Sequence, residues 1–313
     1  SAAPPRTIWS WELRSDASLV LLTAGIVYTF GWLRLRQTGN VRLANFGRLF
    51  AYLGGLLTIA IALMSGIDEL QPYLFWVHMV QHELLMVVAA PLILVGWPMP
   101  FTLWGLPPSL RRHASRLLAH DRILRRGLDL LLRPVIAFAI STLTLWLWHL
   151  PAAYDAALAN NWVHNLEHVS FFGAFILYWW VLIGAPPRPS RLTSNAARGL
   201  YLLAGATQIA LLGGLITLSD QVLYTHYLTV QSLTGLSALQ DQQLAGAIMW
   251  FPGPLIFGIA AALLMRDDEG REEPYQPVDE LRRGTNGLEA RHQAEAAPAP
   301  AQSHTSTSVS AKA

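Results

Sequence analysis

The amino-acid sequence predicts an all-α protein that crosses a membrane with seven helices. Its composition is too apolar for a soluble domain, since 53% of the residues are hydrophobic and 13% are charged, whereas soluble domains carry about 25% charged residues. The apolar residues are collected into stretches long enough to span a bilayer. Nearly all arginines lie in alternate connections between these stretches, which is typical of a protein with a fixed orientation in a membrane.

Seven apolar stretches reach the length of about 20 residues that a transmembrane helix needs. In chain order they are residues 17–35, 46–65, 74–96, 134–150, 162–184, 198–218 and 243–265. Pro151 follows the fourth stretch directly, and we expect the helix to end there because proline lacks the backbone N–H group that a helix needs. The seventh stretch contains Pro252-Gly253-Pro254, which predicts a kink.

Basic residues predict the orientation. Of the 22 lysines and arginines, all except Arg6 and Arg14 lie in or beside the connections after the first, third and fifth stretches, or in the C-terminal tail. The connections 66–73, 151–161 and 219–242 contain none. Because basic connections remain in the cytoplasm, we expect the N-terminus outside, the C-terminus in the cytoplasm and the protein in a bacterial plasma membrane.

The remaining segments differ in composition. Residues 1–16 contain tryptophan and suit an interfacial segment on the outer surface, and residues 105–133 combine leucine and arginine as an amphipathic segment on the cytoplasmic surface does. Residues 266–313 are acidic and then rich in Ala, Pro, Ser and Thr, which predicts a disordered cytoplasmic tail. Residues 17–265 therefore form one transmembrane domain. Its surroundings are the lipid bilayer, and we expect no nucleic-acid partner.

Five histidines fall at one predicted depth of three spans. His78 and His82 lie in the third stretch, His149 ends the fourth, and His164 and His168 begin the fifth. Both pairs lie roughly 7 and 13 Å from the outer end of their helices at 1.5 Å per residue. Residues at i and i+4 share a helix face, and ionisable groups in a bilayer are costly unless they serve a function. The pattern predicts a metal site in the outer leaflet.

The ligand types suit a borderline or soft metal. The chain has no cysteine, so histidine, methionine and carboxylate must bind any soft metal. Imidazole suits copper, zinc, nickel and iron, with the intrinsic affinity order highest at Cu²⁺, and thioether sulfur favours Cu(I), which makes Met79 and Met86 additional candidates. Glu83 and Glu167 each adjoin a histidine in the sequence, so each could bind the metal or orient an imidazole ring.

Four segments resemble the multi-span CtaG family of cytochrome c oxidase assembly factors. They are HMVQHELLMVVAAPLILVGWP (78–98), WLWHLPAAYDAAL (146–158), HNLEHVSFFGAF (164–175) and DQQLAGAIMWFPG (241–253). The resemblance implies a role in inserting copper, as Cu(I) or Cu(II), into a haem-copper oxidase. The implied partners are the oxidase subunit that carries the intramembrane copper centre and an extracytoplasmic copper donor. The family's motif histidines fall on the five histidines above, and its acidic motif falls on Asp241.

This interpretation is of a metallochaperone rather than an enzyme, and three alternatives remain open. A b-type haem electron-transfer protein would use one histidine on each of two helices. A copper transporter would need a polar path across the inner leaflet, where Gln208 is the main polar residue. A zinc membrane hydrolase would use a glutamate as its general base.

Overall fold

The computed structural model describes residues 11, 15–120, 122–186, 192, 194–230 and 233–268. The predicted interfacial segment 1–16 lies almost entirely outside these residues, as does the predicted disordered tail beyond Asp268. Residues 1–265 form one compact unit, to which the description below is confined. Its described residues contain helices and one isolated bridge between Trp11 and Ser65, but no strand.

The helices are, in chain order, α1 (Ser15–Gln37), α2 (Phe46–Met64), α3 (Gly66–Leu70), α4 (Phe75–Glu83), the π-helical turn η1 (Leu84–Ala89), α5 (Ala90–Val95), α6 (Pro98–Gly105), α7 (Pro108–His120), α8 (Arg122–Leu131), α9 (Pro134–Trp148), α10 (Pro151–Ala159), α11 (Asn161–Ile183), α12 (Asn195–Leu218), α13 (His226–Thr229), α14 (Ala238–Trp250) and α15 (Pro252–Asp268). The predicted all-α class is confirmed.

Six segments are long and apolar enough to cross a membrane. They are Ala17–Gln37, Phe46–Met64, Phe75–Val95, Asn161–Ile183, Asn195–Leu218 and Ala238–Leu263. The predicted fourth span differs, because α9 has only 15 residues and its length of about 22 Å is less than the ~30 Å of a hydrocarbon core. Helix α8 precedes α9 at a bend of 71°. The part of the chain that the structure describes therefore has six candidate membrane spans, or seven if α8 and α9 count as one.

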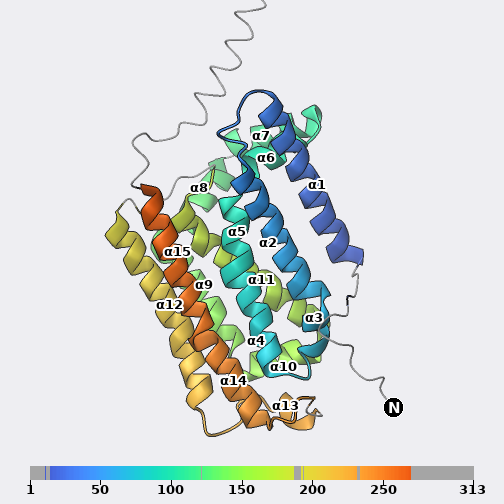
Figure 1. Ribbon diagram of the computed structural model, residues 1–313, viewed down its shortest axis with the longest axis vertical. Helices are drawn as coiled ribbons and strands as arrows, with labels where there is room; N and C mark the ends of the chain where they lie inside the picture. Colours follow the sequence, from blue (N-terminus) through green and yellow to red (C-terminus); the bar gives the residue numbers. More distant parts are fainter. Residues whose placement is uncertain are drawn as a thin grey trace, which may run out of the picture. The chain divides into compact units, whose positions relative to one another are not determined.

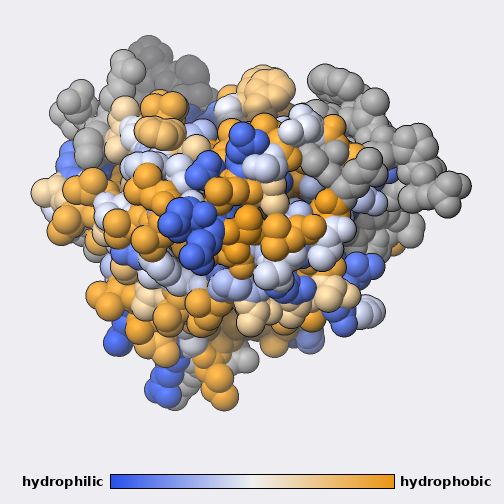
Figure 2. Space-filling model, turned by 90° about the horizontal axis from the view of Figure 1, so that it is seen from below, coloured by the Kyte–Doolittle hydropathy of each residue, from blue (hydrophilic) through white to orange (hydrophobic). Residues whose placement is uncertain are grey.

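Short helices mark the two ends of the bundle (Figure 1). Helices α3, α10 and α13 and the starts of α4 and α14 lie together at the lower end, and α6 and α7 lie at the upper end. We call the lower end the histidine end. Helix α4, which carries His78 and His82, begins there, and α9 ends there, directly before His149. Figure 2 shows the histidine end from outside, where apolar and polar side chains are mixed on the surface.

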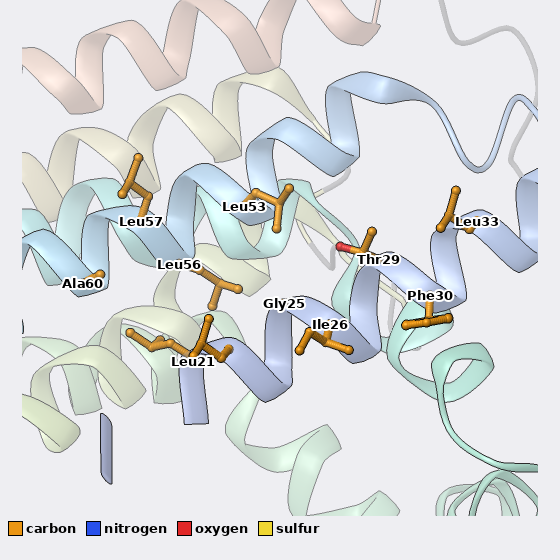
Figure 3. Close-up of a pocket in the computed structure, with 11 residues that line it drawn as sticks. Leu21, Gly25, Ile26, Thr29, Phe30, Leu33, Leu53, Leu56, Leu57 and Ala60 are labelled. Carbon is orange, nitrogen blue, oxygen red and sulfur yellow. The ribbon is translucent and has the colours of Figure 1, made fainter. Parts of the chain in front are cut away.

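Of the three clusters of buried hydrophobic side chains among the described residues, the two larger ones hold most of the helices together. The smaller one joins α1, α2 and α6, where the rings of Tyr28 and Tyr52 stack at 3.8 Å. Farther along, α1 and α2 leave between them an apolar groove of about 450 Å³ (Figure 3). The larger cluster joins α4, η1, α5, α9, α11, α12 and α14, and the histidine-bearing helices belong to it.

Helices α12 and α14 approach each other closely at two glycines. A β-carbon at Gly213 would lie 2.7 Å from the Gly246 carbonyl oxygen and 2.7 Å from the Trp250 backbone nitrogen. Backbone atoms cannot move aside without separating the helices. This contact fixes α14 beside α12, and α14 in turn contacts the start of α4.

Replacing Gly213 with alanine should therefore destabilise the protein. We expect a loss of about 1–3 kcal/mol, as for other overpacked interiors, seen as a lower unfolding temperature in detergent. The neighbouring Gly214→Ala variant is the control, because its β-carbon would meet the Trp250 ring at 3.7–3.9 Å, an ordinary contact. Equal stability of the two variants would contradict the close α12–α14 packing.

Candidate metal centre

Helix α4 carries His78 and His82 on one face, and α14 anchors its first turn. The residue before α4, Leu74, has no side chain that can cap the helix. Instead, Asp241 accepts hydrogen bonds from the Phe75 backbone N–H at 2.8 Å and from the Trp76 N–H at 3.2 Å. A carboxylate at a helix N-terminus satisfies free N–H groups and complements the helix dipole. Asp241 therefore holds the helix that bears the first histidine pair.

Helix α11 supplies the opposing side chains. It begins after Asn160, whose side-chain oxygen accepts a hydrogen bond from the Trp162 N–H. His164, Glu167 and His168 follow at spacings of three and four residues, so they share one helix face. All three are buried, and Glu167 is fully so.

The two faces meet around the Glu167 carboxylate. His78 Nε2 lies 3.8 Å from one carboxylate oxygen, and His82 Nε2 lies 3.7 Å from the other. With His168 added, one ligand atom from each of the four residues lies within 4.8 Å of the others. We call His78, His82, Glu167 and His168 the four-ligand cluster. Its members come from helices distant in sequence and are at most 5% exposed.

His164 and His149 lie at the edge of this cluster. The His164 ring is 5.4 Å from His78 and 4.2 Å from His168, and the His149 ring is 6.0 Å from His82. His149 ends α9, where its Nδ1 donates to the Leu145 carbonyl at 2.7 Å. That hydrogen bond leaves a lone pair on Nε2. All five histidines predicted to converge thus lie in one chain of adjacent rings.

Glu83 lies apart from the cluster, although it follows His82 directly. A β-carbon at Gly253 would be 3.0 Å from each of its carboxylate oxygens, so Glu83 points to the junction of α14 and α15. Met79 and Met86 are fully buried in the larger hydrophobic cluster. Asp241 caps α4. Among the described histidine and carboxylate side chains, neither Glu83 nor Asp241 belongs to the group whose ligand atoms converge.

Four aromatic residues pack together beside the histidines. Phe75 contacts the rings of Tyr154, Tyr224 and Tyr227, with centroids 5.2, 4.6 and 5.3 Å away. We call these four residues the aromatic roof. The Tyr154 hydroxyl is hydrogen-bonded to His78 Nδ1, and the Tyr224 hydroxyl donates to the His149 carbonyl at 3.0 Å.

Burial raises the pKa of all three roof tyrosines above the ordinary value, so each retains its proton and can donate. Tyr154 lies in the motif segment 146–158, whereas Tyr224 and Tyr227 lie in the connection 219–242, outside the four segments that resemble the family. The sequence of these connections has no helical periodicity from which to infer the direction of a side chain.

Removing the Asp241 carboxylate should loosen the start of α4. We expect Asp241→Ala to cost about 1–2 kcal/mol, the range for a lost helix cap, and to speed hydrogen exchange at the Phe75 and Trp76 amides. Exposed Asp220 on the neighbouring loop provides the control variant Asp220→Asn. Unchanged exchange at both amides would show that the carboxylate does not hold α4.

Comparisons with known proteins identify the family to which the chain belongs. Uncharacterized proteins of Mycobacterium bovis and Mycobacterium tuberculosis are each 30% identical over 252 residues, which cover 78% of this chain and 37% of theirs. One from Mycobacterium leprae is 27% identical over 268 residues, covering 83% of this chain and 39% of its own. The chain thus spans well under half the length of these relatives. No solved structure matches. The family model of the cytochrome c oxidase caa3 assembly factor matches residues 26–267, and the chain therefore belongs to the Caa3_CtaG family of cytochrome c oxidase assembly factors.

Proposed function

We propose that this assembly factor binds copper in the four-ligand cluster and delivers it to the oxidase subunit that carries the intramembrane copper centre. The observation that carries the proposal is a group of buried nitrogen and oxygen atoms whose electron pairs accept no hydrogen bond. His78 Nε2, His82 Nε2 and both Glu167 oxygens have no hydrogen-bond partner among the described residues. Buried polar atoms without partners are costly. A cation among them removes that cost, whereas a neutral occupant offers no equivalent compensation.

The geometry is close to that of a bound ion. Two ligands on one ion, each about 2.0–2.2 Å away, are at most ~4.4 Å apart, compared with the limit of 4.8 Å in the cluster. The four ligand atoms thus lie within about 0.4 Å of the largest separation that a single bound ion allows.

The donor set favours copper as the cargo. Three imidazoles and one carboxylate suit borderline metals, and the intrinsic affinity order peaks at Cu²⁺. Haem-copper oxidases need copper during assembly, and this chain belongs to a family of cytochrome c oxidase assembly factors. Cu(II) fits this cluster better than Cu(I), because its converging ligands are imidazole nitrogens and a carboxylate, whereas soft thioether sulfur favours Cu(I).

The arginines support the predicted orientation. Arg111, Arg112 and Arg116 lie on α7, at the end of the bundle opposite the histidine end (Figure 1). The positive-inside rule then puts α7 in the cytoplasm and the cluster near the outer surface. We infer seven spans with α8–α9 as the fourth, the N-terminus outside and a copper donor on that side. The aromatic roof must move for copper to enter or leave.

Losing both α4 histidines should abolish copper retention. We expect a purified His78→Ala/His82→Ala variant, loaded with copper and washed, to hold only background metal by elemental analysis, because two of four ligands are gone. The His113→Ala variant controls for histidine content, since His113 is exposed on α7. Undiminished copper in the double variant would refute the site, and a Soret band in the wild type would favour the haem alternative.

Glu83 and Glu167, each of which adjoins a histidine in the sequence, give a matched test of the ligand set. Glu167→Gln keeps the shape of the side chain but removes its charge, and we expect Cu(II) affinity to fall about tenfold or more, equivalent to ~1.4 kcal/mol. Glu83→Gln should leave affinity unchanged, because Glu83 faces Gly253. Competition with a chelator of known affinity measures both. The reverse order of effects would mean that Glu83, not Glu167, binds the metal.

A further inference from the structure

A row of buried hydrogen bonds leads from the backbone to the four-ligand cluster. The Tyr227 hydroxyl donates to the Gln71 carbonyl at 3.0 Å and lies 2.9 Å from the Tyr154 hydroxyl. The Tyr154 hydroxyl is in turn hydrogen-bonded to His78 Nδ1. Each of these four residues is at most 7% exposed, so the groups are protected from exchange with solvent.

Counting protons fixes the direction of this row. A carbonyl oxygen can only accept, so the single Tyr227 proton goes to Gln71. The Tyr227 oxygen must then accept from Tyr154, which uses the single Tyr154 proton. The Tyr154 oxygen is left as an acceptor, and the remaining hydrogen bond requires a proton on His78 Nδ1.

We propose that Tyr154 and Tyr227 are positioning residues that fix the tautomer of His78, so that its Nε2 lone pair faces the cluster. Neutral imidazole carries one proton, so a proton held on Nδ1 leaves Nε2 as an acceptor or metal ligand. That nitrogen lies 3.8 Å from the Glu167 carboxylate. The Gln71 carbonyl is three hydrogen bonds away from His78. It thereby determines which nitrogen of His78 can bind a metal.

The tautomer of His149 is fixed in the same way, through a single hydrogen bond. Its Nδ1 donates directly to the Leu145 carbonyl at 2.7 Å, which leaves the lone pair on Nε2. In both histidines a backbone carbonyl, which can only accept, sets the tautomer. Fixing a ring by a hydrogen bond at its other nitrogen is the usual way in which proteins orient metal-binding histidines.

The tautomer can be read directly in metal-free protein. In the full chain with ¹⁵N-labelled histidine rings, long-range proton–nitrogen correlation spectra distinguish Nδ1–H from Nε2–H, and His78→Gln identifies the signal. We expect Nδ1–H in the wild type. In Tyr227→Phe, Tyr154 loses its acceptor and donates to His78 Nδ1 instead, so the signal should change to Nε2–H.

Tyr224→Phe is the matched control, because Tyr224 belongs to the same aromatic roof but donates to the His149 carbonyl. It should leave the His78 signal unchanged. A tyrosine that merely packed against its neighbours would not exchange one His78 tautomer for the other. Nε2–H in the wild type, or Nδ1–H retained in Tyr227→Phe, would overturn the proposal.

The consequence for copper rests on the proposed function and is measured separately. Tyr227→Phe should bind Cu(II) about 10–100-fold more weakly, the range for lost groups that orient metal ligands, whereas Tyr224→Phe should bind like the wild type. If the tautomer changes as expected but the wild type binds no copper, the copper function fails and the positioning role stands. If copper binds but the His78 tautomer is the same in all three proteins, the positioning role fails alone.

Discussion

The carboxylate of Glu167, held between two imidazole nitrogens inside a helical bundle, is the constraint on which the rest of this structure depends. Such a group is costly to bury without compensation. Its two oxygens have no hydrogen-bond partner among the described residues, and the nearest side chains to them are imidazole rings. Helix α4 offers two histidines, α11 offers two more beside the carboxylate itself, and α9 ends with the fifth.

The supporting elements form a second level of organisation. Asp241 fixes the start of α4 from α14, and α14 is fixed against α12 through Gly213 and Gly246. The aromatic roof then joins the connections at the histidine end to the histidines by hydrogen bonds. The position of His78 is thus determined from two directions, by its helix and by the tyrosines above it. The proposed copper site therefore has one of its ligands held in place before any ion binds.

The sequence allowed much of this to be anticipated, and the reasons are physical. Apolar length identifies a membrane span, and a spacing of four residues places His78 with His82 and His164 with His168 whatever the surroundings. Those local rules hold because a helix in a bilayer must satisfy its own backbone. For the same reason, the two histidine pairs can be predicted from the sequence without knowledge of any tertiary contact.

The remaining features depend on how helices are rotated against one another. Glu83 and Glu167 look equivalent in the sequence, yet α4 turns Glu83 toward Gly253 while α11 turns Glu167 toward the histidines. Asp241 was expected near the metal, but the free N–H groups of α4 engage it. The bend of 71° between α8 and α9 and the direction of Tyr154 likewise follow from packing between segments far apart in the chain.

If one metal ion is bound by imidazole and carboxylate from α4 and α11, X-ray absorption at the copper edge of the copper-loaded full chain will show those ligands. We expect a nearest shell of nitrogen and oxygen, outer-shell scattering from several imidazole rings, and only background copper absorption from His78→Ala/His82→Ala. A nearest shell of methionine sulfur, or the same spectrum at full intensity from the double variant, contradicts this site.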